Sequence, residues 1–293
     1  FDPSGGTDNR TSNGSNDIFL SKYSSDGTYL WTKTFGGTSD DSGRSVTLDN
    51  SGSLYLTGLF ASASVDFDPE SSVDTYSAVG SNDMFLSKYS SDGTYLWTKT
   101  VGGGLVSPYS MTVDGNDNVY LNGYYSGTVD FDPGSGVDNQ TSNLGGGNND
   151  VFLSKYLSNG TYQWTKTVGG VGGQYGYSVA VDESGYIYLA GYFSNTVDFD
   201  PGSGVDNYTP PGGAGTYDAF LSKYASDGTY QWTKTVGGTS EDNGYSVTLD
   251  GSGNLYFAGD FQGTVDFDPG SGTDNHTSNG SYDVFFSKYS SDG

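Results

Sequence analysis

Short runs of apolar residues alternating with polar ones recur along the whole chain. In the first copy these runs are DIFLSKY (17–23), TYLWTKTFG (28–36), RSVTLD (44–49) and SLYLTGLF (53–60). Alternation with a period of two is typical of β-strands, because successive side chains of a strand point to opposite faces of the sheet. The pattern predicts four strands in each repeated unit.

The tripeptide Phe-Asp-Pro marks the repeat. It begins at five places, separated by 66, 64, 68 and 68 residues: Phe1, Phe67, Phe131, Phe199 and Phe267. The chain begins and stops inside this pattern and has no Met at position 1, so we expect it to be an excerpt of a longer array. A firm period of this length indicates tandem units that are stabilised by packing against their neighbours.

Asp-Gly or Asn-Gly lies between the first and second runs of each unit and predicts a two-residue type I′ hairpin loop. In the first copy, this loop would pair Ser25 with Thr28 and set Lys22 opposite Trp31. Apolar side chains then fall on both faces of the hairpin, so each sheet should be sandwiched between neighbouring sheets. The four dipeptides are Asp26-Gly27, Asp92-Gly93, Asn159-Gly160 and Asp227-Gly228.

The composition supports an all-β fold. The chain has 47 glycines and 25 tyrosines, with 33% hydrophobic residues, so turn formers and strand-favouring aromatics dominate. No stretch is long and apolar enough to predict a membrane-spanning helix. Without any cysteine, neither disulfides nor thiolate chemistry can form.

Two runs and their copies, SVTLDNSGSLYLTG and DIFLSKYSSDGTYLWTKTFGG, resemble the SBBP repeat, a bacterial β-propeller repeat of secreted and cell-surface proteins. The resemblance implies tandem four-stranded antiparallel blades, with RSVTLD innermost and YLWTKT outermost. It also implies an extracellular or cell-surface location. The chain departs from the simplest form by an insert, TVDFDPGSG in several copies, between the second and third strands of each blade.

Counting strands along the chain divides it into five segments. An open or incomplete array then fits better than a closed four-bladed ring, because the count exceeds sixteen strands. The segments are an outer hairpin of an incomplete blade (1–43), three full blades (44–103, 104–170 and 171–238) and a last blade without its outer strand (239–293).

The net charge of −24 comes from 35 acidic residues, 32 of them Asp, against 11 basic ones. This balance argues against nucleic acid as a partner.

The inventory of side chains gives little support to catalysis. The single histidine, His276, stands where other copies have Arg, Gln or Tyr, so a Ser-His-Asp or Cys-His pair is not expected.

The insert carries the best candidate for a metal site. In an extended Val-Asp-Phe-Asp segment the two carboxylates lie on one side, and the Pro-Gly turn could bring a third acid back toward them, as Ca²⁺ requires. The alternative is plain turn chemistry, since Asp before Pro commonly opens a turn. The candidate calcium ligands are Asp66, Asp68 and Asp74; Asp130, Asp132 and Asp138; Asp198, Asp200 and Asp206; and Asp266, Asp268 and Asp274.

Three further series recur once or twice per unit. The acids at the entry of the first run (Asp17, Asp83, Asp150, Asp218 and Asp283) are expected to cap a strand or its loop. The regular lysines are expected to pair with Trp or with Asp. Asn-X-Thr sequons in the insert, such as Asn139-Gln140-Thr141, allow glycosylation of an exposed loop.

Two functions fit these patterns. The first is a non-enzymatic structural or adhesive protein of the cell surface or extracellular space, fibre-forming and calcium-stabilised, whose partners are copies of itself or a surface glycan or protein. The alternative is a carbohydrate- or ligand-binding β-propeller that uses its rim loops.

Overall fold

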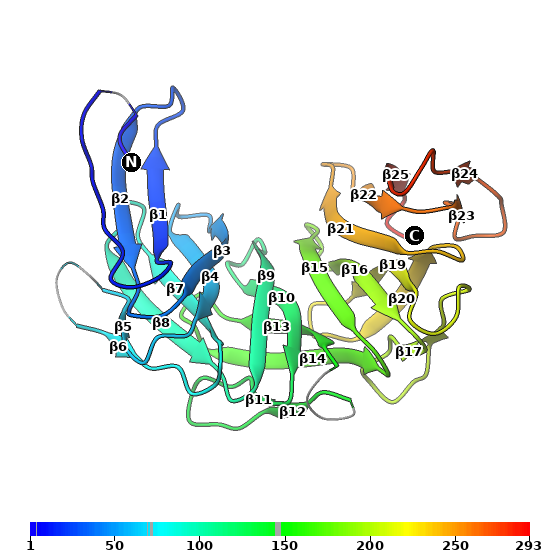
Figure 1. The fold of residues 1–293 in the computed structure, drawn as a ribbon, viewed down its shortest axis with the longest axis horizontal. Coiled ribbons are helices and arrows are strands. Elements are labelled where there is room, and N and C mark those ends of the chain that lie inside the picture. Colours follow the sequence, from blue (N-terminus) through cyan, green and yellow to red (C-terminus); the bar gives the residue numbers. More distant parts are fainter. Residues whose placement is uncertain (4, 69, 71–72, 144–147) are drawn as a thin grey trace. The chain divides into compact units, whose positions relative to one another are not determined.

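The structure, a computed structural model, describes residues 1–3, 5–68, 70, 73–143 and 148–293. Every regular element in these residues is a β-strand, so the all-β prediction is confirmed. Two compact units make up the chain, Phe1–Pro108 and Tyr109–Gly293. Figure 1 shows their strands in chain order.

The first unit contains one hairpin, one four-stranded antiparallel sheet and one short hairpin made by the insert. The order of strands across the sheet is β3-β4-β7-β8, so β3 and β8 are its edge strands. The strands are β1 (Ile18–Tyr23), β2 (Tyr29–Phe35), β3 (Asp41–Leu48), β4 (Leu54–Phe60), β5 (Val65–Asp66), β6 (Thr75–Tyr76), β7 (Asp83–Tyr89) and β8 (Tyr95–Val101).

The second unit repeats this plan. The order β9-β10-β13-β14 is extended by the insert strands β17 and β18, and two further sheets run β15-β16-β19-β20 and β21-β22-β25. The first of its strands starts in the last residues of the first unit. The strands are β9 (Leu105–Val113), β10 (Val119–Ser126), β11 (Thr128–Asp130), β12 (Asn139–Thr141), β13 (Asp150–Tyr156), β14 (Tyr162–Gly170), β15 (Gln174–Val181), β16 (Ile187–Ser194), β17 (Val197–Asp198), β18 (Asn207–Tyr208), β19 (Tyr217–Tyr224), β20 (Tyr230–Val236), β21 (Asp242–Leu249), β22 (Leu255–Phe261), β23 (Thr264–Asp266), β24 (Asn275–Thr277) and β25 (Asp283–Tyr289).

The type I′ prediction for the hairpin loops is wrong. Gly27 has a positive φ of 83°, but Asp26 is not among the residues with positive φ, whereas a type I′ turn needs both. The Gly27 N–H donates to the carbonyl of Ser24, and the Ser24 N–H donates to the carbonyl of Thr28, each at 2.9 Å. The loop is therefore three residues long, with the glycine in the left-handed position.

The predicted register beyond this loop is nevertheless correct. Tyr23 pairs with Tyr29, one position out of the predicted register, and an irregularity next to Tyr23 then restores it, so that Lys22 lies opposite Trp31. The longer loop and the irregularity offset each other. The assignment of side chains to the two faces is unchanged as a result.

Stacked sheets bury both faces in the second unit. On the sheet β15-β16-β19-β20, Leu189 and Phe220 pack with Val151 of the preceding sheet. The next residue, Leu221, points to the opposite face and packs with Phe257 of the following sheet. The prediction of a sandwiched sheet is confirmed here. Whether the whole chain forms an open array stays a prediction, since it concerns the placement of the two units.

The insert contributes two apolar side chains to the core beside each sheet. Its Val and Phe are buried in all four internal copies, at 0% exposure for Val197 and Phe199. Tyr224 of β19 is also buried and donates its hydroxyl to the carbonyl of Phe199 at 3.3 Å. Alternation of Phe with Asp therefore seats the aromatic ring between two sheets and directs the neighbouring acids to the other side of the segment.

The Gly-Gly pair at the end of β14 allows two close approaches. A Cβ on Gly169 would lie 2.1 Å from Asp150 Cγ, and a Cβ on Gly170 would lie 2.5 Å from the carbonyl oxygen of Thr196. The first glycine makes room for the acid at the strand entry. The second makes room for the insert backbone.

Candidate functional site

The first acid of each insert caps the turn that follows it. Asp66 Oδ1 accepts the backbone N–H groups of Asp68 and Asp74, both at 3.0 Å. The second acid caps a further turn, as where Asp132 Oδ1 accepts the N–H of Gly134 at 2.8 Å. The first-acid bonds recur at Asp130, Asp198 and Asp266, and the second-acid bond recurs at Asp200 and Asp268.

The third acid points to a tyrosine of the outer strand. Asp138 Oδ2 accepts the hydroxyl of Tyr162. Burial and the hydrogen bond to Asp138 raise the pKa of Tyr162 above its ordinary value, so this hydroxyl stays a donor at neutral pH. The same link joins Asp74 to Tyr95 and Asp206 to Tyr230. Asp274 instead contacts His276 Nε2 at 3.0 Å.

The three insert carboxylates thus serve three different partners. The loop does return the backbone of Asp74 to Asp66, as the sequence predicts, but the Asp74 carboxylate turns away to Tyr95. Within the described residues, no three His, Cys, Asp or Glu side chains converge on a point where they could hold a metal ion. Pro69 of the first internal insert lies outside these residues. The calcium site stays a prediction, while the contacts of the acids are those of the turn alternative.

The acids at the strand entry cap the preceding loop, as predicted. Asp83 accepts the N–H groups of Val79 at 2.7 Å and Gly80 at 3.0 Å. Asp17, Asp150 and Asp283 each accept the N–H of an asparagine in the same loop. These bonds give each loop amide an acceptor that it would otherwise lack.

Asp218 is the exception among these acids. Its side chain is buried, and none of the hydrogen bonds among the described residues reaches its carboxylate. Asp17 and Asp150 also leave Oδ1 unpaired, but each accepts an N–H at Oδ2. Pro211 stands 68 residues after Asn143, where the donor to Asp150 lies, and proline has no N–H. Burial, followed by the charge of Asp242, raises the pKa of Asp218 to about 8.

The lysines pair with tyrosine more than with tryptophan. Lys88 Nζ lies 4.6 Å from the ring centre of Tyr55, which is opposite it in the register, and forms an ion pair with Asp49 at 2.9 Å. Lys155, Lys223 and Lys288 lie over the equivalent rings of Tyr120, Tyr188 and Tyr256. Stacking on Trp is found for Lys33 over Trp31, from the same strand. Lys22, which the register places opposite Trp31, donates to the carbonyl of Ser91 at 2.6 Å.

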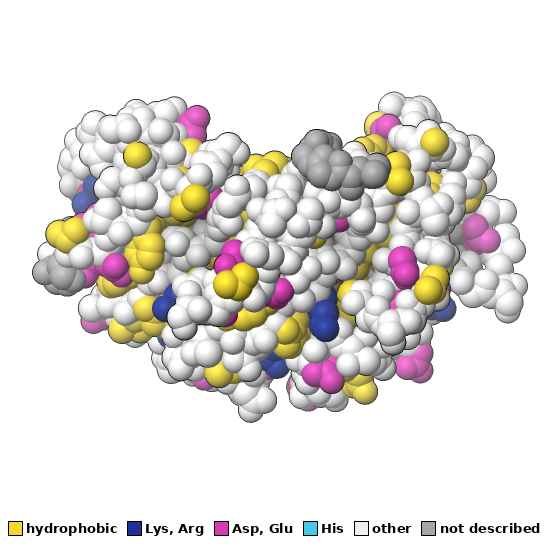
Figure 2. All heavy atoms as spheres, turned by 90° about the horizontal axis from the view of Figure 1, so that it is seen from below, with side chains coloured by type: hydrophobic (Ala, Val, Ile, Leu, Met, Phe, Trp, Pro, Cys, Tyr) yellow, Lys and Arg dark blue, Asp and Glu magenta, His cyan; other side chains and the backbone are white. Residues whose placement is uncertain are grey.

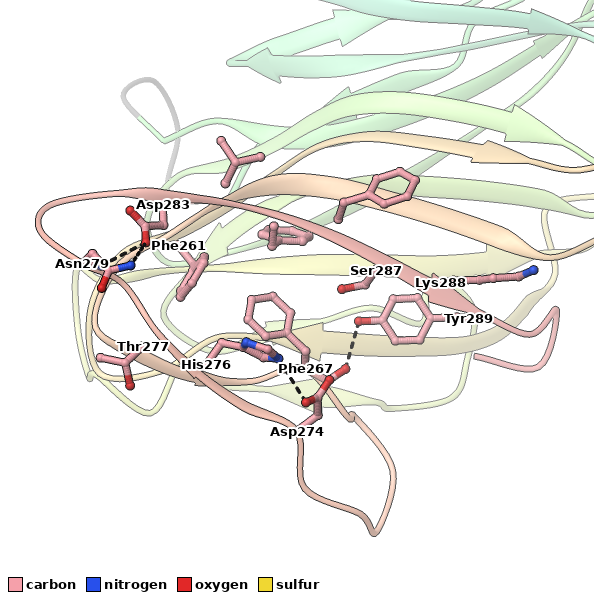
Figure 3. A pocket seen from close by; sticks show the side chains of 13 residues that line it. Phe261, Phe267, Asp274, His276, Thr277, Asn279, Asp283, Ser287, Lys288 and Tyr289 are labelled. Carbon is pink, nitrogen blue, oxygen red and sulfur yellow. Dashed lines mark hydrogen bonds and ion pairs between the residues drawn. The ribbon is translucent and has the colours of Figure 1, made fainter.

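A cavity with a volume of about 530 Å³ lies beside β25. In Figure 3, His276 points to Asp274 and Asn279 to Asp283 along its wall. In a complete sheet the fourth strand occupies the equivalent place, since β20 pairs with β19, the strand that corresponds to β25. This cavity is therefore the position of an outer strand.

A different set of side chains makes an unusual surface in the second unit. Seven tyrosines form one continuous network with ring centres 4.5–6.4 Å apart. Six of them are half-buried, and Tyr245 is 43% exposed. We call this set the tyrosine cluster: Tyr109, Tyr124, Tyr175, Tyr177, Tyr192, Tyr217 and Tyr245.

A β-bulge directs two of these side chains. Gly176 pairs with Gly191 and Ser178 with Ala190, so Tyr177 is the extra residue between them. Tyr245 is the extra residue of the matching bulge in β21. A bulge turns a side chain out of the regular alternation of its strand. The bulge needs glycine opposite, since a Cβ on Gly191 would lie 1.9 Å from the carbonyl oxygen of Tyr175.

Acids border the exposed end of the tyrosine cluster. Tyr282 donates its hydroxyl to Glu241, and Asn243 Nδ2 donates to Asp260 Oδ1 at 2.9 Å. The hydrogen bond to Glu241 raises the pKa of Tyr282 to about 12, and burial together with the charge of Asp260 raises that of Tyr245 to about 12. At neutral pH this end presents neutral phenols beside carboxylates.

Basic side chains lie elsewhere in the unit. The strands β9, β10, β15, β16, β21 and β22 contain no Lys or Arg. On the face of the molecule in Figure 2, the described Lys and Arg side chains lie apart from one another and form no continuous basic patch. The lysines of the unit belong to the other strands: Lys155, Lys166, Lys223, Lys234 and Lys288.

Sequence reasoning directed attention to the insert and missed the tyrosine cluster. One signal was present: Tyr109, Tyr177 and Tyr245 are spaced by 68 residues, the period of the repeat. The bulges that direct Tyr177 and Tyr245 outward have no comparable sequence mark, because Gly-Tyr-Ser is also compatible with a regular strand.

These observations define a class of protein, a tandem-repeat protein of β-propeller-like fold with four-stranded antiparallel sheets. No family model matches the chain. It is 28% identical over 268 residues to an uncharacterized WD repeat-containing protein of Acanthamoeba polyphaga mimivirus, which covers 80% of this chain. It is 26% identical over 246 residues to the regulatory protein FlaEY of Caulobacter vibrioides, covering 78% of this chain.

The chain spans 19% and 24% of the length of these two relatives. The likeness to a WD repeat protein agrees with the observed sheets, since WD repeats also form four-stranded blades. None of the described residues forms a helix long and apolar enough to cross a membrane.

Proposed function

We propose that this chain is a non-enzymatic adhesive repeat protein of the cell surface or extracellular space, and that it contacts its partner through the tyrosine cluster. The cluster is the observation that carries the proposal. Tyrosine offers a large, rigid contact area and a polar hydroxyl at low entropic cost, which is why it is enriched in binding interfaces.

The rest of the molecule supports a scaffold role. Its sheets bury apolar residues on both faces, and its inserts use their acids to hold turns and outer strands together. Repeats built in this way present their edge strands and loops at regular intervals. Function then resides on exposed edges and loops, and the core supplies rigidity.

A test of the proposal compares the wild-type chain with a variant that carries Tyr109→Ser, Tyr177→Ser and Tyr245→Ser. Tyr186→Ser serves as the matched control, because Tyr186 is 36% exposed and lies outside the cluster. Adsorption to amine-coated, sugar-coated and apolar sensor surfaces is measured with a quartz-crystal microbalance. The triple variant should lose at least about tenfold in affinity for one surface, equal to roughly 1.4 kcal/mol. Equal adsorption of triple variant and wild type on every surface would count against the proposal.

Self-association is a separate part of the same proposal. If copies of the chain are its partner, electron microscopy of the purified protein should show filaments, and the triple variant should shorten them. Isolated particles at high concentration would restrict the partner to another molecule.

A discrete ligand-binding propeller is the second candidate, and the unequal repeats favour it. Asp260 stands where Tyr124 and Tyr192 stand in other copies, and Arg44 stands at the position of Tyr177. These differences make the cluster a single site in place of several equal ones. A binding stoichiometry of one ligand per chain would support this candidate, and several equal sites would support the adhesive one.

A further inference from the structure

We propose that the acidic end of the tyrosine cluster binds a cationic peptide segment, whose arginine or lysine side chains enter between the tyrosine rings and the carboxylates of Glu241 and Asp260. This inference rests on the proposed function and specifies the partner of the same surface.

The end of the cluster is formed by side chains from three places in the sequence. Tyr245 lies on β21, where the bulge turns it outward. Glu241 precedes that strand, and Asp260 lies on the neighbouring β22. Tyr282, which is 43% exposed, joins them through its hydrogen bond to Glu241. Two exposed rings and two half-buried carboxylates therefore meet at one edge.

The carboxylates have no counter-charge in the described structure. The ion pairs of the second unit engage Asp250 and Asp274, not Glu241 or Asp260. Asp49 of the first unit, by contrast, has a cation in Lys88. The strands that carry six of the seven tyrosines contain no Lys or Arg. The seventh, Tyr217, begins β19, and Lys223 near the other end of that strand donates to the carbonyl of Ser291 at 2.9 Å.

The chemistry of this end favours a cation. The face of an aromatic ring attracts ammonium and guanidinium groups, most strongly where water is partly excluded. A nearby carboxylate adds a charge-assisted hydrogen bond. The chain already uses the same combination internally, since Lys88 lies over the ring of Tyr55 and beside Asp49. A guanidinium fits best, because its plane can stack on a ring while its edge donates to a carboxylate.

The complementary charge also selects between partners. A neutral sugar could stack on the same rings, but it would leave two carboxylates without a cation. A polyanion would be repelled by them. A segment of a partner protein with several basic side chains satisfies both parts of the surface.

Isothermal titration with a hexaarginine peptide tests the inference, using the whole chain at low and at moderate salt. Hexaglutamate and maltohexaose are the comparison probes. We expect hexaarginine to bind, to bind more weakly as salt rises, and to bind at least about tenfold more weakly to the double variant Glu241→Gln with Asp260→Asn. The matched control Glu183→Gln removes one exposed charge outside the cluster and should change affinity less than about twofold.

Two ring variants separate this site from general attraction to an acidic chain. Tyr245→Ser keeps the net charge and should weaken hexaarginine binding several-fold, whereas Tyr245→Phe keeps the ring and should bind like wild type. Equal binding by wild type, Tyr245→Ser and the double variant would overturn the inference. Binding of maltohexaose but not hexaarginine, abolished by Tyr245→Ser, would also overturn it and yet leave the proposed function intact.

Discussion

Replacing Asp218 by asparagine should stabilise the protein at alkaline pH. The carboxyl of Asp218 is buried, Oδ1 has no donor, and its pKa is raised to about 8 from an ordinary value of 3.8. The folded state therefore binds this proton more tightly than the unfolded state. The stability that Asp218 contributes is fully present below about pH 4 and is lost as the pH rises through about 8.

The size of the effect follows from the raised pKa. One pKa unit corresponds to about 1.4 kcal/mol, which sets an upper limit of roughly 6 kcal/mol for the loss above pH 8. Two effects reduce this limit. Buried sites in proteins respond as though the effective dielectric constant were near 20. Part of the raised pKa also comes from repulsion between Asp218 and Asp242, which belongs to the pair and not to Asp218 alone. We therefore expect about 3 kcal/mol, or roughly 6–12 °C in melting temperature for a unit of this size.

The assay measures the melting temperature at pH 5, 7 and 9, with circular dichroism as the readout of unfolding. Wild type should lose stability toward pH 9 more steeply than Asp218→Asn. The control is Asp83→Asn. Because Asp83 accepts two N–H groups, this substitution should destabilise the protein at every pH tested. An identical pH dependence of wild type and Asp218→Asn would refute the reasoning, since the difference between them isolates this one carboxyl.

Three other predictions concern the scaffold. Gly169→Ala should destabilise the protein by about 1–3 kcal/mol in urea unfolding, because the new Cβ would overlap a buried carboxylate, whereas Gly251→Ala meets no atom within 4 Å and should be nearly neutral. Tyr162→Phe should lower the free energy of unfolding by about 1–3 kcal/mol, because the hydrogen bond to Asp138 is lost, and Tyr186→Phe should lower it much less. Equal decreases for the two variants would contradict the role of that bond. If the insert acids only hold turns, saturating chelator should leave the melting temperature unchanged, and a clear decrease would instead support calcium.

The local pattern of the chain determined a large part of the fold. Alternating residues and a repeat of 64–68 residues predicted the strands, their hairpins and the insert between them. The pairing of Lys22 with Trp31 could be predicted because side-chain alternation has a period of two, which holds the register even where the loop differs in length. The acids at the strand entry could be predicted as caps for the same local reason.

Tertiary structure decided which of these residues are buried and where the acids point. Leu221 and Phe286 occupy equivalent positions, yet they are 2% and 72% exposed, because only the first has a neighbouring sheet over it. Asp138 and Tyr162 are 24 residues apart, and no local rule brings them together. Tyr177 and Tyr245 became candidates for binding only through the bulge and the neighbouring sheets, since these contacts join residues far apart in the sequence.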